Sequence, residues 1–240
     1  TAGGAQKREL GTSVTPLKVS DVVQAGATPS IEALLKGRAP GVTVIQTSGQ
    51  VGAGAQVRIR GIGTFSLSST PLVYVDGIRV DNAQTGQVAR FNDFDPEQIE
   101  SIEVLKGPAA ATLYGTEAAR GVINIITKRG VTGTTKYTFT IKQGNSWFDD
   151  AHNRIPVNYW YNPADGKVWS VHLPTTEAAR GTPLFKNGPN SSYSASVSGG
   201  TGTYRYYASG DVSAAEGLPT PNSRTPTTVR TTLRVFPKPP

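Results

Sequence analysis

The sequence predicts an α+β protein in three parts: an N-terminal extension (residues 1–20), a domain with a small mixed sheet and two short helices (21–130), and an extended antiparallel β-strand tail (131–240). Short β-branched runs and two helix-like segments lie before residue 130, whereas longer segments that alternate apolar and polar side chains follow it. Most of the aromatic residues and prolines also lie after residue 130, and such shifts in composition often mark domain boundaries.

Both predicted helices are short and have clear start and stop signals. Thr28 and Pro29 suit the N-cap and the first helical position of one helix, and Gly37 ends it. Its apolar face consists of Ile31, Leu34 and Leu35. The second helix follows Gly107 and Pro108 and covers residues 109–114.

The predicted strands of this domain are short and rich in valine and isoleucine. They cover residues 42–46, 57–60, 72–75, 78–80, 102–105 and 122–127. The Asp76-Gly77 pair between the third and fourth strands is a hairpin turn signal. Residues 96–99 predict a single helical turn, and the nearly all-apolar run 122–127 predicts a strand buried on both faces.

The tail predicts β structure interrupted by one long irregular stretch. Period-2 segments cover residues 134–143, 193–198, 203–213 and 227–236, and a glycine-rich turn at 199–202 joins the middle two. Residues 144–190, which contain all three tryptophans, predict no regular element. Such alternation is typical both of a soluble antiparallel sheet and of transmembrane β-barrel strands, and periodicity alone does not separate them.

Composition and motifs exclude several function classes. The chain has no cysteine, which removes thiolate metal sites and cysteine nucleophiles. The net charge is +7, but the basic residues are scattered, so we expect no nucleic-acid partner. His152 and His172 lack partners at metal-ligand spacing, and no nucleophile elbow or phosphate-binding loop occurs. We therefore expect no enzyme, no catalytic residue, no metal and no cofactor.

One hexapeptide, TEAARG, occurs twice, at residues 116–121 and 176–181. The residues around the two copies differ, so the pair does not predict a repeat architecture.

Several motifs occur in an order that resembles the plug domain of TonB-dependent outer-membrane receptors. These are VRIRG (57–61), VDG (75–77), IESIEVLKG (99–107), LYG (113–115) and GVINIITK (121–128). The preceding segments LKGRAPGV (35–42) and SGQVGAG (48–54) are similar to the SusC-like branch, and residues beyond 130 resemble its opening barrel strands.

The resemblance implies a plug-type domain and a set of contact residues. Charged contacts between the plug and a surrounding wall would come from Arg58, Arg60, Glu100 and Glu103. The loops at 62–71 and 81–95 would face a ligand or a protein partner through Phe65, Leu67, Arg90, Phe91 and Phe94. Members of this branch import oligosaccharides and peptides together with a lipoprotein lid.

Two functions follow from the resemblance. A barrel with a plugged lumen needs about 22 strands, whereas the residues after 130 predict far fewer. We therefore expect a non-catalytic binding or structural subunit that docks on the periplasmic side of a larger membrane complex, for example a respiratory, photosynthetic or outer-membrane complex. The alternative is the N-terminal part of a SusC-like importer with an oligosaccharide or peptide ligand. Both place the chain in the bacterial cell envelope, as a periplasmic, membrane-associated or outer-membrane protein.

Overall fold

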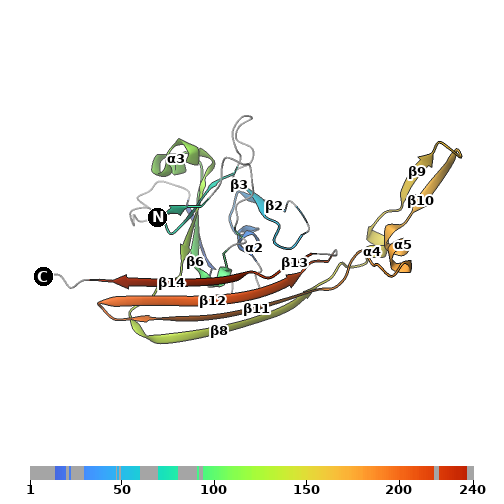
Figure 1. The fold of residues 1–240 in the computed structure, drawn as a ribbon. Coiled ribbons are helices and arrows are strands. Elements are labelled where there is room, and N and C mark those ends of the chain that lie inside the picture. The colour runs from blue at the N-terminus through green and yellow to red at the C-terminus, as the bar shows by residue number, and fades with distance from the viewer. Residues whose placement is uncertain are drawn as a thin grey trace.

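The computed structural model describes residues 14–19, 22, 30–46, 48, 50–59, 70–80, 91, 94–218 and 222–236. They form two packed parts (Figure 1). We call the described residues up to 127 the N-terminal domain. The strands between residues 133 and 235 that pair around β12 form the C-terminal sheet. Residues 128–132 join the two.

The N-terminal domain contains a mixed five-stranded sheet and a separate two-stranded hairpin. The order in the sheet is β1-β6-β7-β4-β5, in which β4 and β7 are parallel and the other neighbours are antiparallel. Its strands are β1 (Val14–Lys18), β4 (Leu72–Val75), β5 (Ile78–Arg79), β6 (Ile99–Leu105) and β7 (Val122–Thr127). The hairpin pairs β2 (Val42–Gln46) with β3 (Ala55–Ile59). The small mixed sheet predicted from the sequence is confirmed.

Helix α2 (Ile31–Leu35) begins two residues later than expected. Its N-cap is Ser30, whose hydroxyl accepts a hydrogen bond from the Ala33 amide at 3.2 Å. Thr28 and Pro29 lie outside the described residues. The second helix, α3 (Pro108–Tyr114), is confirmed, and two single-turn helices, η4 (Pro96–Gln98) and η5 (Thr116–Arg120), precede β6 and β7.

The core lies between α2, the hairpin and the mixed sheet. Its fully buried side chains include Ile31, Leu35, Ile102, Ile123 and Ile125. Five of the six residues of β7 are buried, as the apolar run 122–127 predicts, because separate clusters of apolar side chains pack on its two faces. Packing of this core fixes the positions of the turns that join the strands of the domain.

Two expectations from the sequence need correction. Strand β1 pairs with β6 over its whole length. The sheet therefore begins within residues 1–20, the segment that the sequence predicts to be an N-terminal extension. The stretch 144–190 is not irregular either. It contains α4 (Ala151–Arg154), β9 (Asn158–Asn162), β10 (Lys167–Val171) and α5 (Leu173–Ala179). The missed signal is the turn 163–166, which joins two short aromatic strands.

The C-terminal sheet is antiparallel, as predicted. Its long strands lie in the order β8-β11-β12-β14, and the short β13 also pairs with β12. Their bounds are β8 (Gly133–Ser146), β11 (Gly188–Gly200), β12 (Tyr204–Glu216), β13 (Ser223–Arg224) and β14 (Thr227–Val235). The N-terminal domain lies against one face of this sheet, and the β9–β10 hairpin extends from one end (Figure 1).

The two faces of the C-terminal sheet differ in polarity. On the face turned away from the N-terminal domain, the side chains of Phe139 and Val229 are 76% and 79% exposed. On the opposite face, Tyr207 and Asp211 are 4% and 5% exposed. Side chains alternate along a strand, so residues two apart share a face. The face with Phe139 and Val229 is apolar, and the face with Asp211 is polar.

The two copies of TEAARG adopt related local structures in different surroundings. The first forms η5 and ends at Gly121, which has a φ of +104°. The second forms the end of α5 and ends at Gly181, with a φ of +78°. The hexapeptide is therefore a helix end with a glycine that takes a left-handed φ.

Among the described residues, no helix is both long enough and apolar enough to cross a membrane.

Candidate functional site

The candidate site is the polar interface between the N-terminal domain and the C-terminal sheet. Three turns of the N-terminal domain reach the sheet: the β4–β5 turn, the η4 turn and the β2–β3 turn. The first two both contact β14, and the third contacts the connection between β12 and β14.

Asp76, in the β4–β5 turn, joins three segments of the chain. Its carboxylate lies 2.8 Å from an Nη of Arg230 on β14 and 3.1 Å from an Nη of Arg129 in the connection between the two parts. It also accepts hydrogen bonds from the amide and the hydroxyl of Thr127 at the end of β7. Burial alone would raise the pKa of Asp76, but these partners together lower it to about 2.

The turn geometry explains why Asp76 can reach these partners. Asp76 has a φ of +50° and Gly77 a φ of +89°, as a two-residue hairpin turn with two left-handed positions requires. The Asp76 amide also donates to the Ile125 carbonyl at 2.9 Å, which holds the turn against β7. The carboxylate is thereby placed at the end of β7, where the connection to the C-terminal sheet begins.

The η4 turn makes the second contact. The Gln98 amide group donates to the Thr228 hydroxyl at 2.8 Å and to the Asp211 carboxylate at 3.3 Å, and Thr228 also hydrogen-bonds Asp211. Beside it, Glu97 and Lys142 form an ion pair at 2.6 Å. The turn is held by Asp95, whose carboxylate accepts from the Glu97 amide at 3.0 Å.

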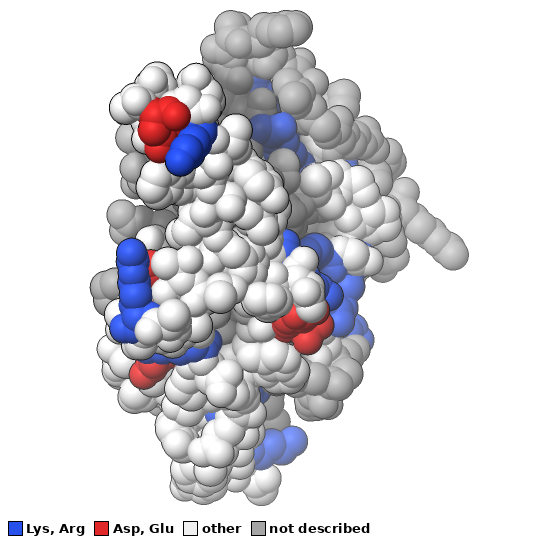
Figure 2. Space-filling model, turned by 90° about the vertical axis from the view of Figure 1, so that its right-hand side faces the viewer, with Lys and Arg blue, Asp and Glu red and all other residues white. Residues whose placement is uncertain are grey.

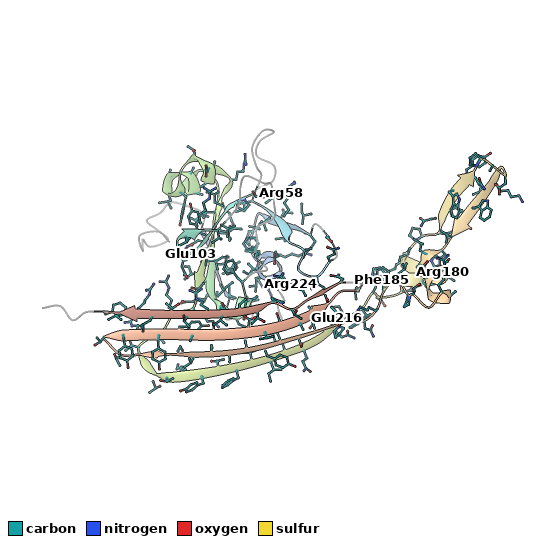
Figure 3. All side chains as sticks on the ribbon, in the orientation of Figure 1. Arg58, Glu103, Arg180, Phe185, Glu216 and Arg224 are labelled. Carbon is teal, nitrogen blue, oxygen red and sulfur yellow. The ribbon has the colours of Figure 1, made fainter. Side chains whose placement is uncertain are left out.

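The β2–β3 turn makes the third contact, with the connection between β12 and β14. The Val51 amide donates to the Asn222 side chain at 3.1 Å. A Cβ added to Gly52 would lie 2.5 Å from Cδ of Arg224, so the arginine side chain packs directly on the turn. Figure 3 shows Arg224 between the N-terminal domain and the sheet.

A cavity of about 780 Å³ lies between these contacts. From the N-terminal domain it is lined by the start of α2, the β2–β3 turn and the η4 turn, and from the sheet by the β13 ends of β8, β11 and β12. Glu32 and Asp95 contribute buried carboxylates to it. Its volume falls within the range of roughly 300 to 1,000 Å³ that is usual for small-ligand sites.

Three of the four charged residues predicted as wall contacts lie in the described part of the chain. Arg58 donates to Gln56 in its own strand at 2.9 Å, and Glu103 accepts from Asn124 on the neighbouring strand at 3.3 Å, so these bonds stay inside the N-terminal domain (Figure 3). Glu100 is exposed on β6. Arg60 lies outside the described residues. Contacts of these side chains with further parts of a wall remain a prediction.

The predicted loop contacts are largely untested. Phe65, Leu67 and Arg90 lie outside the described residues. Phe94 is half-buried, packs against the core and lines the cavity. Phe91 is 1% exposed and belongs to the core, so its aromatic ring is unavailable to a ligand or partner. The expectation that Phe91 faces a ligand or a partner is therefore wrong, because its large apolar side chain packs in the core instead.

The interface residues were missed because nothing in local spacing relates them. Asp76 and Arg230 are 154 positions apart, and Gln98 and Thr228 are 130 apart. One available signal is the Asp76-Gly77 pair, which predicts a turn but does not indicate a partner for the Asp76 carboxylate. A second signal was the polar half of the period-2 pattern on β12 and β14.

The structure also brings the two histidines together. Their rings meet edge to face with centroids 4.6 Å apart, and the Thr175 hydroxyl lies within hydrogen-bond distance of Nδ1 of both. Across the described part of the chain, no three His, Cys, Asp or Glu side chains gather in a way that could hold a metal ion.

Charge is dispersed over the coloured part of the face that Figure 2 draws. In Figure 2, Lys and Arg form separate groups with Asp and Glu beside some of them, and most of this face is uncharged. The basic net charge is therefore not gathered into one stripe on this face, which agrees with the scattered basic residues of the sequence.

Comparisons with known proteins agree with this architecture. Residues 6–122 match the TonB-dependent receptor plug domain family. The fold and the interface thus define a receptor plug domain docked on the first strands of its wall. The chain belongs to the TonB-dependent receptors and, within them, to the SusC-like branch. It is an outer-membrane protein of the bacterial cell envelope.

Two curated relatives and one solved structure illustrate the similarity. The chain is 30% identical over 205 residues to the TonB-dependent receptor SusC of Bacteroides thetaiotaomicron, with 82% of this chain and 20% of the relative covered. It is 30% identical over 229 residues to the TonB-dependent receptor P3 of Formosa agariphila, with 90% and 21% covered. The RagAB peptide importer in its open-open state has the same fold, with a TM-score of 0.74 at 24% identity and coverage of 95% and 29%.

These matches decide between the two functions expected from the sequence. The chain spans about a fifth of the length of the curated relatives SusC and P3. The expected subunit of a respiratory or photosynthetic complex finds no support, because the matches are to receptors. The importer alternative fits better.

Proposed function

We propose that the N-terminal domain is the gate of a SusC-like importer and that the C-terminal sheet is the part of the wall on which the gate rests. The observation that carries this proposal is the two-sided C-terminal sheet. Its apolar face, with Phe139 and Val229, suits lipid, and its polar face holds the N-terminal domain through Asp76 and Gln98.

The contacts suit a gate that can open. They are ion pairs and hydrogen bonds between side chains that are partly exposed, 22% for Asp76 and 35% for Arg129, and water can replace them. A large apolar interface would instead cost much free energy to expose. The ligand of such an importer is an oligosaccharide or a peptide, and the partners are an outer lipoprotein and an energy-transducing protein. Nothing in this arrangement calls for catalysis.

The test is to pin the gate to the wall. Val51→Cys and Asn222→Cys place two thiols where an amide and a short side chain are 3.1 Å apart, in a chain with no other cysteine. Uptake of a labelled glucosamine tetramer, a labelled N-acetylglucosamine tetramer and a labelled tetrapeptide is measured in the native bacterium. We expect the oxidised pair to abolish uptake of whichever probe is imported and a reductant to restore it.

Each single cysteine variant serves as a control and should import normally under oxidising conditions. Normal uptake with the pair fully oxidised would contradict a gate that has to leave this part of the wall.

A further inference from the structure

The cavity between the N-terminal domain and the C-terminal sheet has an unusual lining. Most of its polar side chains are hydroxyls and amides, among them Ser30, Gln46, Ser48, Asn190 and Ser192. Among the described residues of the lining, Phe94 alone has an aromatic ring. Hydroxyls and amides both donate and accept hydrogen bonds, so this surface suits a ligand that carries many hydroxyl groups.

Glu32 is a buried acidic side chain of this cavity, with Ser30 and Arg224 as its polar neighbours. It is 2% exposed, and neither carboxylate oxygen accepts a hydrogen bond from any residue that the structure describes. Burial raises the pKa of Glu32, which its own backbone amide, the Ser30 hydroxyl and the Arg224 charge offset in part. A buried carboxylate without a bonded partner costs free energy that a ligand could recover.

Asp95 adds a second acceptor. One oxygen holds the η4 turn, and the other is buried without a hydrogen-bond partner in the described ranges. The nearest lysine in the lining, Lys142, is already paired with Glu97, and Glu216 at the rim is paired with Lys186. The described part of the lining therefore contains four carboxylates, Glu32, Asp95, Asp211 and Glu216, against two cations, Lys142 and Arg224, and has an excess of acidic groups.

We propose that this cavity binds an amino-sugar oligosaccharide, whose hydroxyls meet the Ser, Asn and Gln side chains and whose protonated amine meets Glu32 and Asp95. This ligand class rests on the proposed importer function and narrows it. A neutral sugar would add no cation to a lining in which carboxylates outnumber cations. The hydroxyls of a sugar match the many Ser, Asn and Gln side chains of the lining better than the side chains of most peptides would.

The experiment compares two ligands that differ only at the amine. A β-1,4-linked glucosamine tetramer and the corresponding N-acetylglucosamine tetramer are titrated calorimetrically into the 240-residue chain in detergent micelles. At about pH 6 the free amine is protonated. We expect the glucosamine tetramer to bind at least tenfold more tightly than the acetylated one.

Variants locate the site. Glu32→Gln keeps the shape and removes the charge, so it should weaken binding of the glucosamine tetramer by roughly tenfold or more. Asp95→Asn, which still caps the η4 turn, should weaken it as well. The matched control is Glu117→Gln on η5, an exposed carboxylate paired with Arg79 outside the cavity, and it should change the affinity by less than about twofold.

Each outcome supports or overturns the assignment. A melting curve recorded for every variant separates lost binding from lost folding. Equal binding of the two tetramers, no binding of either to the folded chain, or full affinity in Glu32→Gln would each overturn it. None of these results affects the cross-linking test, in which oxidation of the cysteine pair should block uptake of whichever probe is imported.

Discussion

Replacing Gly121 by alanine is expected to lower the free energy of unfolding by about 3 to 5 kcal/mol. Gly121 has φ +104° and ψ 166°, a backbone region that is essentially closed to other residues. A Cβ there would also lie 2.7 Å from Cδ1 of Ile59 and 2.8 Å from the carbonyl oxygen of Leu105. Strain and overpacking therefore act together, at the junction of β3, β6 and β7.

The chain provides a matched control within the same hexapeptide. Gly181 ends the second copy of TEAARG with a φ of +78°, and a Cβ there meets no atom of the described residues within 4 Å. Gly181→Ala should cost only about 1 kcal/mol, from the backbone alone. Urea unfolding followed by circular dichroism measures both variants. Equal losses would show that the contacts with Ile59 and Leu105 do not matter.

Replacing Asp76 by asparagine is expected to remove about 2 kcal/mol of stability at neutral pH. The carboxylate is held ionised by Thr127, Arg230 and Arg129, and its pKa of about 2 lies below the ordinary value of 3.8. Its side chain is 22% exposed, so solvent screens these contacts only in part. Asparagine keeps the size of the side chain and loses the charge.

The same pair of pKa values fixes the pH dependence. A carboxylate whose pKa is lower in the folded state stabilises fully above its unfolded pKa, and this contribution disappears as the pH falls through the folded pKa. The original protein should therefore lose this contribution between about pH 4 and pH 2, whereas Asp76→Asn should show a flatter profile there. Unfolding midpoints measured across this range provide the check, and parallel profiles would contradict it.

Local signals were sufficient where a segment's own residues determine its structure. The Asp76-Gly77 turn, helix α3 after Pro108 and the buried strand β7 all follow from short-range patterns. The alternation on β8, β11, β12 and β14 likewise predicted two faces of different polarity. What it could not predict is which face would be covered, because that depends on a domain far away in the sequence.

The candidate site depends on such distant pairing. Asp76 by itself indicates only a turn, and Arg230 is one of two arginines in β14, a strand with alternating side chains. Their contact follows from the parallel pairing of β4 with β7, which brings the turn to the point where the chain enters the sheet. The cavity is a further step away, since it exists only after both parts have packed.

The central claim is that Asp76 and Arg230 attach the N-terminal domain to the polar face of the C-terminal sheet. The most direct test is a double-mutant cycle with Asp76→Asn and Arg230→Gln, measured as free energies of unfolding in detergent micelles. We predict a coupling energy of about 1 to 2 kcal/mol, as expected for a partly buried ion pair with a 2.8 Å contact. Effects that add to within about 0.5 kcal/mol would contradict the claim.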